Sequence, residues 1–331
     1  MICLAGRYED YSDFGDTFNG KVTARYEFSD AFALRGAVST GFRAPSLHQQ
    51  FFNNIATDIV DGELLNTGIF RNDSEVAKQL GIPKLEEETS VSYSIGFTYK
   101  PLKNLSFTVD AYRIEIDDRI ILTGSLGNDP FGDPVPELRD LFGQFGASTG
   151  RFFTNAVDTE TNGLDVVVDY NTGLGSGKLT ASLLYNINDN NVKDGINNLP
   201  AAFVGQEDVY FGPQEKSLIE SNIPKHKAIL NLNYAIGRFN FFVRNTYFGQ
   251  VTRNGFPFGV SQKHDPRTVT DLSSSVELFK GLQFTAGVNN VFDEFPDRQA
   301  YDNSFFGVFK YAPVQMGTTG AYYFARLTYK L

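Results

Sequence analysis

The stretch that decides the fold is Phe18-Asn19-Gly20-Lys21-Val22-Thr23-Ala24-Arg25-Tyr26-Glu27-Phe28. Apolar or small residues take every second position, and polar or charged residues such as Lys21 and Arg25 take the positions between them. Because successive side chains of a β-strand point to opposite faces, the stretch predicts a strand with one apolar and one charged face. Its length exceeds the usual globular strand of about 5–6 residues and matches the roughly 9–11 residues that a tilted strand needs to cross a bilayer.

The same alternation recurs along the whole chain. It predicts twelve strands, near residues 2–9, 18–28, 32–43, 90–100, 105–116, 161–170, 178–188, 227–236, 239–249, 268–278, 282–292 and 321–331. Tyr and Phe tend to stand near the ends of these rows, where the aromatic girdles of membrane barrels meet the headgroups. The alternation changes phase around Arg113-Ile114, which predicts a β-bulge or a section above the bilayer.

The connections between the predicted strands alternate between short and long. The short ones lie at 29–31, 101–104, 171–177, 237–238 and 279–281, and the long ones at 44–89, 117–160, 189–226, 250–267 and 293–320. This alternation is typical of an outer-membrane barrel, whose periplasmic turns are short and whose extracellular loops are long. We therefore expect an all-β, antiparallel transmembrane β-barrel sheet located in the outer membrane, in contact with its lipid.

The bulk composition narrows the possible partners. A net charge of −10 argues against nucleic acid, because phosphate binding needs clustered Lys and Arg. The single cysteine, Cys3, excludes an internal disulfide and a thiolate metal cluster. The first residues contain no apolar core long enough for a signal peptide, so we expect the chain to begin inside a strand.

No pattern of residues predicts an enzyme, a metal site or a cofactor. The three histidines, His48, His226 and His264, are scattered over different loops and strand entries, and neither a nucleophile elbow nor a phosphate loop is present. The stretch 189–195 resembles a calcium loop, but Lys193 stands at a ligand position and position 200 is Pro rather than Glu. We interpret it as a solvated turn.

Charged residues of the predicted strands give the expected direction of each face. A charge on the lipid face at mid-bilayer costs roughly 2–4 kcal/mol, so strand charges should face the lumen. The residues assigned to the lumen are Arg25, Arg35, Arg43, Asp165, Asp169, Arg244, Asp271 and Glu277, the four acidic ones being available partners for the arginines. Four uncharged or basic polar residues should also face inward: Lys21, Thr23, Asn231 and Asn233. The residues expected to contact lipid are Val22, Ala24, Tyr26, Leu230, Leu232 and Tyr234.

Polar and aromatic residues of the long loops are candidates for ligand contact. His48 and Gln49 follow directly after a predicted strand, at the mouth of the expected barrel, and are interpreted either as ligand contacts or as ordinary loop polarity. The loop aromatics could grip a ligand or could pack the loops together; they are Phe51, Phe52, Phe152, Phe153, Phe305 and Phe306.

Four phrases of the sequence resemble TonB-dependent outer-membrane receptors. They are Ser39-Thr40-Gly41-Phe42-Arg43-Ala44-Pro45-Ser46-Leu47, Leu85-Glu86-Glu87-Glu88-Thr89-Ser90, Thr154-Asn155-Ala156 followed by Thr161-Asn162-Gly163-Leu164-Asp165, and Gly287-Val288-Asn289-Asn290-Val291-Phe292-Asp293-Glu294. Their order and spacing extend over nearly the whole chain. Two positions depart from the family pattern: Glu replaces the usual Pro in the second phrase, and Leu331 stands where the assembly signal usually has Phe.

The resemblance implies a function as well as a fold. Such receptors have a barrel of about 22 strands, an N-terminal plug inside it, and a TonB box ahead of the plug. Residues 1–331 then correspond to the C-terminal half of the barrel domain, without plug, box or signal peptide. The implied activity is active uptake of a large, scarce nutrient, with a ferric siderophore as the usual ligand and the TonB complex as the partner that supplies energy; vitamin B12, haem and oligosaccharide remain open.

Two other interpretations are kept. One is a passive outer-membrane channel or structural barrel, and the other is a soluble β-rich carbohydrate-binding protein or adhesin. We also expect that an isolated run of twelve strands has unpaired edges at its first and last strand, because a sheet taken from a larger barrel cannot close with the same tilt and stagger. Such a chain alone should form an open or forced-closed curved sheet and should not transport.

Overall fold

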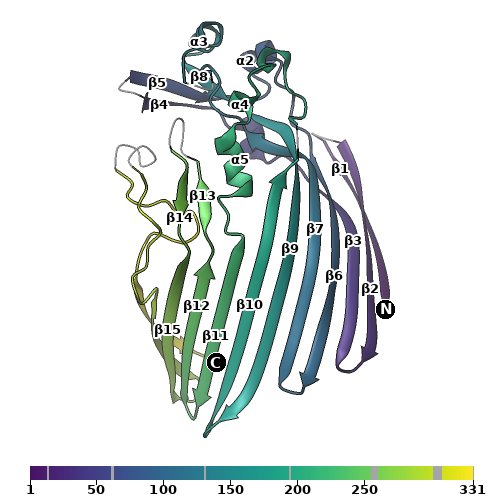
Figure 1. Cartoon of the computed structure of the whole chain (residues 1–331), viewed down its shortest axis with the longest axis vertical. Coiled ribbons are helices and arrows are strands. Elements are labelled where there is room, and N and C mark those ends of the chain that lie inside the picture. The colour runs from purple at the N-terminus through teal and green to yellow at the C-terminus, as the bar shows by residue number, and fades with distance from the viewer. Residues whose placement is uncertain are drawn as a thin grey trace.

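The computed structural model describes residues 1–12, 15–60, 63–129, 132–193, 195–254, 260–300 and 308–330. Its main feature is one twelve-stranded antiparallel sheet in which the strands pair in chain order (Figure 1). The strands are β1 (Ile2–Tyr11), β2 (Gly15–Ser29), β3 (Phe32–Arg43), β6 (Glu88–Leu102), β7 (Leu105–Leu122), β9 (Phe153–Leu174), β10 (Gly177–Val192), β11 (His226–Ile236), β12 (Phe239–Phe248), β15 (Arg267–Phe279), β16 (Leu282–Asn289) and β17 (Tyr322–Tyr329). The twelve predicted strands are thus confirmed.

The five shortest turns and the long connections lie at opposite ends of the sheet, while the short β1–β2 connection lies at the end of the long ones (Figure 1). Five two-residue turns, at 30–31, 103–104, 175–176, 237–238 and 280–281, form the short-turn end. Gly175 and Gly237 stand in two of them with φ of 58° and 55°, a left-handed conformation that tight hairpins require and that glycine adopts without strain. The long connections all lie at the other end, as the alternation predicted.

The register of the ladder gives the sheet two chemically different faces. Val22 lies opposite Val38, which lies opposite Tyr93, and this apolar face continues across the sheet. Lys21 lies opposite Ser39, which lies opposite Ser92, on the polar face. Directly opposed residues of an antiparallel pair share a face, so the pairing carries the alternation of each strand across the whole sheet.

The sheet is curved and open. In the described residues the pairing runs from β1 to β17 without a ladder between these two strands. The expectation of an open curved sheet is therefore confirmed. The exposed edge of β1 carries unpaired backbone groups, and in hydrocarbon such groups must be paired by further strands.

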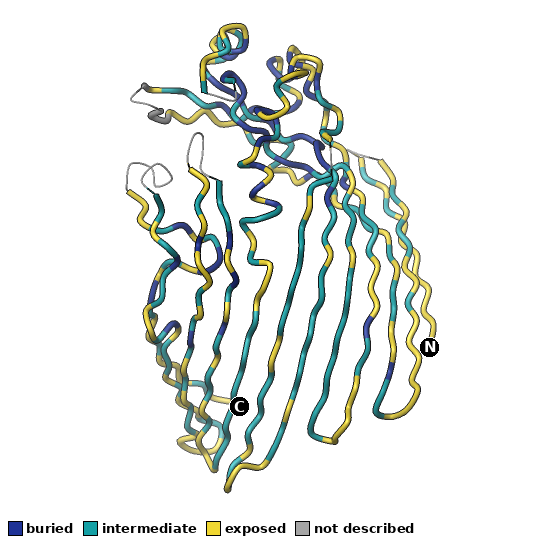
Figure 2. The backbone as a smooth tube through the Cα atoms, in the orientation of Figure 1, coloured by how far each residue is buried: buried dark blue, intermediate teal, exposed yellow. Residues whose placement is uncertain are grey.

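The long connections carry small elements of their own. They are α1 (Leu47–Phe51), β4 (Asn54–Val60), β5 (Glu63–Ile69), α2 (Glu75–Leu80), α3 (Pro136–Gly143), β8 (Thr149–Arg151), a 3-10 turn (Ala201–Phe203), α4 (Glu207–Tyr210), α5 (Pro213–Glu220), β13 (Val251–Arg253) and β14 (Gln262–His264). The described residues of the connections 44–87, 123–152 and 193–225 share one hydrophobic core and are called here the loop cap, which contains many of the buried residues (Figure 2). No helix among the described residues is long and apolar enough to cross a membrane.

Several strands extend further than the alternation predicted, β7 and β9 by the most residues. β7 continues to Leu122 and β9 begins at Phe153, so both rise into the loop cap. The irregularities in the β7–β9 ladder fall between Ile116 and Ile120 rather than at Arg113-Ile114, where the β6–β7 ladder is regular. The bulge was therefore predicted three or more residues too early. The stretch from Asp189 to Val192 belongs to β10, so its interpretation as a turn was wrong.

Candidate ligand-binding surface

The polar face gathers all eight charged residues that the sequence assigned to the lumen. Arg25 lies opposite Arg35, and Asp110 lies opposite Asp165. On the other half of the sheet Arg244 lies opposite Asp271. Residues two apart in a strand lie on the same face, so Arg43, Asp169 and Glu277 also lie on the polar face. The residues share one face, and the placement of that face toward a lumen remains a prediction.

Arg35 forms the central ion pair of the polar face. Its Nε donates to Oδ1 of Asp110 over 2.8 Å, and its terminal nitrogen donates to the other carboxylate oxygen. Gly96 stands between the two residues in the ladder, where a Cβ would overlap the Asp110 carboxylate. The glycine therefore makes room for an ion pair that spans two strands.

A second ion pair lies where the polar face meets the loop cap. Nε of Arg43 donates to Oε2 of Glu88 over 2.7 Å, and the backbone N–H of Ile120 donates to Oε1 over 2.7 Å. The Glu88 side chain is only 6% exposed, so its charge depends on these donors. Arg119 lies beside the pair and donates to Oγ1 of Thr159 over 3.3 Å.

The partners of the arginines differ from those the sequence offered. Arg25 pairs with Glu27, two residues further along its own strand, over 2.9 Å, and Nε of Arg244 donates to Asn231 over 3.0 Å. Asp271 accepts from the backbone N–H of Asn290 over 2.8 Å. Choosing Asp165, Asp169, Asp271 and Glu277 as partners was wrong for Arg35 and Arg43, because the ladder brings Asp110 and Glu88 closer.

A ladder of amides on β10 extends the polar face toward the cap. Asn190 donates to Asn188 over 3.1 Å, Asn188 donates to Asn186 over 2.7 Å, and Asn186 donates to Asp165 over 2.6 Å. Asn186 also donates to the hydroxyl of Tyr112 over 3.2 Å. The sequence analysis did not single out these residues, although asparagine at every second position from 186 to 190 was a visible signal.

The loop cap is held together by a common hydrophobic core. Each of its three connections contributes fully or nearly fully buried aromatic side chains: Phe70, Phe142, Phe152, Phe203 and Tyr210. The rings of Phe70 and Phe142 stack at 6.0 Å, and those of Phe70 and Phe152 at 5.9 Å. The three loops thus form one packed layer beyond the end of the sheet rather than three separate loops.

Two of the sequence phrases meet at the base of the cap. The side chain of Asn155 accepts from the backbone N–H of Glu86 over 2.9 Å and donates to its carbonyl over 3.0 Å. It also donates to the carbonyl of Asp118 over 2.7 Å. This buried amide therefore joins three segments and fixes the direction in which the long connections leave the sheet.

Inside the cap a buried carboxyl faces an arginine. A guanidinium nitrogen of Arg151 lies 3.4 Å from Oε1 of Glu215, and Nε of Arg151 donates to the carbonyl of Thr123 over 2.7 Å. Burial raises the pKa of Glu215, and the nearby Arg151 opposes that shift. The cap core thus contains a titratable group whose charged form is disfavoured.

Four of the candidate ligand contacts lie together in or next to α1. Ser46 and Gln49 form a capping box, in which Oε1 of Gln49 accepts from the Ser46 N–H over 3.0 Å. The ring of His48 lies against that of Phe52 at 4.4 Å. Phe51 is 52% exposed, and the guanidinium of Arg71 lies 5.2 Å from its ring centroid.

The remaining candidates behave differently from those of α1. Phe152 is completely buried in the cap core, so for this residue the alternative interpretation, that it packs the loops together, applies. Phe153 is half-buried at the start of β9. Phe305 and Phe306 lie outside the described residues.

The three histidines stay apart in the fold. His48 lies in α1. His226 is the first residue of β11, and its Nδ1 lies 2.8 Å from the hydroxyl of Tyr185 on β10. His264 is buried in β14, where burial lowers the pKa of its ring against the opposing effect of Asp297. The structure does not bring them into one site.

The sheet and its cap define a class of protein: proteins with a large antiparallel β-sheet of the barrel type and folded loops at one end. Residues 4–291 match the family model described as "TonB dependent receptor-like, beta-barrel". The chain therefore belongs to the TonB-dependent receptor β-barrel family, whose members are outer-membrane receptors and transporters. This confirms the resemblance stated from the sequence phrases. A curated relative, the probable TonB-dependent siderophore receptor PirA of Acinetobacter baumannii, is 27% identical over 124 residues, which are 36% of this chain and 15% of the relative.

Solved structures share the same fold. The siderophore receptor PirA from Acinetobacter baumannii superposes with a TM-score of 0.64 at 15% identity, covering 99% of this chain and 43% of its own. A variant of the ferric enterobactin receptor PfeA from Pseudomonas aeruginosa, in complex with enterobactin, gives 0.62 at 16% identity with the same coverage. The copper transporter OprC gives 0.57 at 16% identity, covering 95% of this chain and 40% of its own. The chain thus spans less than half the length of the structures that it matches.

Proposed function

We propose that this chain is part of a receptor in the outer membrane that binds a ferric siderophore at its extracellular end and imports it by TonB-dependent active transport. The observation that carries the proposal is the loop cap, a folded layer that stands where the polar face of the sheet ends. Family membership and the names of the relatives, two of which are siderophore receptors, support the ligand class.

The polar face suits the passage of a large hydrated solute. Some of its charges are neutralised in ion pairs, as in Arg35 with Asp110 and Arg43 with Glu88. Charges of both signs lie on this face, so it offers hydrogen-bonding groups of both kinds. The amide ladder from Asn186 to Asn190 continues these groups toward the cap. A solute that leaves the cap would find hydrogen-bond partners along the sheet.

The side chains proposed to contact the ligand are the accessible ones of α1. Phe51 offers an exposed ring, and near it in the chain His48 and Phe52 offer two rings in tilted contact. Aromatic faces and a nearby cation at Arg71 suit a flat, electron-rich chelating group. Gln49 acts mainly in capping α1 and so contributes less to binding.

The proposed partners follow from the proposed location in the outer membrane and from the net charge. The apolar face would contact outer-membrane lipid, and the TonB complex would act on parts of the full-length protein outside this chain. No nucleic acid is proposed as a partner, because the net charge is −10. The activity is transport, without bond chemistry.

The test uses the full-length receptor in a strain that lacks it, grown under iron limitation with a panel of ferric siderophores. We expect one of them to be accumulated, and accumulation to stop when the proton gradient is collapsed. Accumulation that continues after collapse would favour the passive channel instead. Failure of every siderophore, together with binding of another nutrient, would refute the ligand class.

A second arm tests the contacts at α1. Phe51→Ala with His48→Ala should weaken binding of the accumulated siderophore, measured by titration on the purified receptor. Leu47→Ala is the matched control, because Leu47 lies in the same helix and is 71% exposed. Equal affinities for the two variants would remove α1 from the binding surface.

A further inference from the structure

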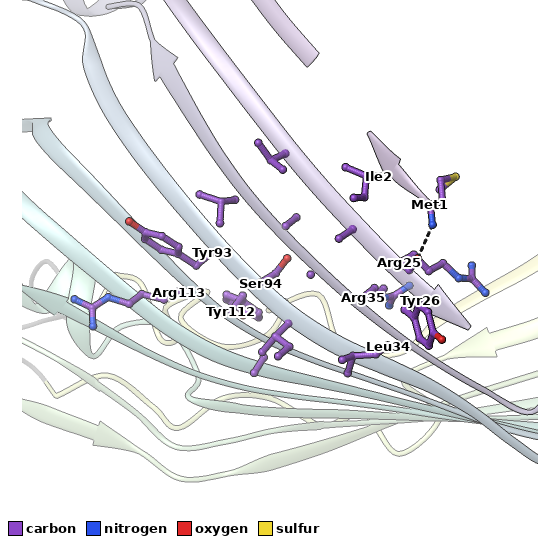
Figure 3. Close-up of a pocket in the computed structure, with 17 residues that line it drawn as sticks. Met1, Ile2, Arg25, Tyr26, Leu34, Arg35, Tyr93, Ser94, Tyr112 and Arg113 are labelled. Atoms are coloured by element: carbon purple, nitrogen blue, oxygen red, sulfur yellow. Dashed lines mark hydrogen bonds between the residues drawn. The ribbon is translucent and has the colours of Figure 1, made fainter. Parts of the chain in front are cut away.

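The apolar face is hollowed at one place, between β1 and β7. The hollow is a groove of about 900 Å³ (Figure 3). Its lining is mostly apolar and includes Val22, Leu34, Tyr93 and Ile95. Residues of the polar rows also border it, namely Arg25, Arg35, Ala37, Ser94 and Tyr112. A groove of this size on the lipid-directed side of a membrane sheet is large enough to hold part of another molecule.

The register explains why the face is hollow here. Ala24 lies opposite Gly36, Gly36 opposite Ile95, and Ile95 opposite Ala111, so three of four positions in one ladder row have small side chains. A Cβ added to Gly36 would meet only the carbonyl oxygen of Ser94, at 3.4 Å. Larger side chains in the rows on either side, among them Tyr26 and Tyr93, form the walls.

One end of the groove carries charges. Arg113 lines the groove and forms ion pairs with Glu115 over 2.7 Å and with Glu160 over 2.6 Å. A charge on the lipid face costs roughly 2–4 kcal/mol at mid-bilayer but only about 0–1 kcal/mol near the interface. Arg113 therefore marks the headgroup level on the side of the loop cap.

The groove lies across the strands. Its row of small residues runs from Ala24 on β2 to Ala111 on β7, and three strand spacings of about 4.8 Å make this roughly 14 Å. Because membrane strands are tilted by about 35–45°, a row across them runs obliquely to the bilayer normal. The groove thus has room for a segment of one tilted chain, and its end on β7 lies two residues from Arg113.

We propose that this groove binds one acyl chain of a lipid in the leaflet on the side of the loop cap, with the lipid headgroup beside Arg113. The apolar lining and the continuity with the lipid-directed face fit a hydrocarbon chain. The inference rests on the proposed outer-membrane location. It adds to that proposal one specific lipid-binding position, which differs from the general contact of the apolar face with lipid.

The test places the photo-crosslinker p-benzoylphenylalanine at Tyr93 in the full-length receptor and identifies the adducts by mass spectrometry after illumination of cells. Tyr247 is the matched position, since it lies on the same face outside the groove and is 38% exposed against 45% for Tyr93. We expect several-fold more lipid adduct at Tyr93. Adding Ala111→Phe, which fills the groove, should reduce the yield at Tyr93 to that at Tyr247, whereas Ala286→Phe on β16 should leave the ratio unchanged.

Other outcomes would overturn the proposal in distinguishable ways. Equal lipid adducts at the two positions would show that the face contacts lipid while the groove holds no particular chain. A crosslink to protein at Tyr93 would show that a second chain covers the groove. The absence of lipid adducts at both positions would refute the membrane location together with the groove.

Discussion

Phe152→Ala should open the loop cap and leave the twelve-stranded sheet intact. The Phe152 side chain is completely buried and packs against Phe70 in a core shared by three connections. Replacing a buried Phe by Ala costs about 3–5 kcal/mol. At about 1.4 kcal/mol for each factor of ten, the open population of the cap should rise roughly a hundredfold to a few thousandfold.

Limited proteolysis of the full-length receptor in detergent measures this opening. Cleavage follows the open population when closing is faster than cutting, so cleavage within the cap should accelerate by a comparable factor. Phe51→Ala is the control, because Phe51 is 52% exposed and lies outside the core; surface changes of this kind stay within about 0.5 kcal/mol. Equal cleavage of the two variants would refute a shared cap core.

Three further predictions concern stability and activity. Glu88→Gln keeps an acceptor for the Ile120 N–H but loses the charge that holds half-exposed Arg43, so the free energy of unfolding in denaturant should fall by about 1–3 kcal/mol. An unchanged midpoint of unfolding would contradict the role of the ion pair. Burial raises the pKa of Glu215 above its ordinary 4.5, so the contribution of Glu215 to cap stability should be greatest at low pH and should fall as pH rises through the raised value. Glu215→Gln should remove this part of the pH dependence of the hydrogen-exchange protection factors of α5, and an unchanged slope would assign it to another group. Expression of residues 1–331 alone should not restore TonB-dependent uptake in a strain lacking the receptor, and uptake that stops on collapse of the proton gradient would show the prediction to be wrong.

The strands were predictable because their signal is local. Most strands of the twelve-stranded sheet alternate with period two, and the glycines at 175 and 237 mark turns that need a left-handed residue. The polar face could be assigned for the same reason, since one residue fixes the direction of all others in its strand.

The loop cap and the ion pairs could not be predicted in this way. The cap core joins residues more than a hundred positions apart, such as Phe70 and Phe203, and its helices are too short to show a periodic pattern. The partner of Arg35 depends on the register across Gly96, which alternation within a strand does not fix. The bulge in β7 was predicted at the wrong residues. The change of phase in the sequence at Arg113-Ile114 marks a change in the surroundings of the side chains, whereas the irregular pairing lies between Ile116 and Ile120, where β7 enters the loop cap.

The central claim is that the apolar face contacts lipid and the polar face lines an aqueous interior. Spin labels at Val22 and Thr23 test it most directly, in the full-length receptor in lipid bilayers with Cys3 replaced by serine. The label at Val22 should collide mainly with oxygen dissolved in the lipid, and the label at Thr23 with a water-soluble relaxant; Leu230 and Asn231 on β11 should repeat the contrast outside the groove. The reversed pattern, or access to water at all four positions, would contradict the account.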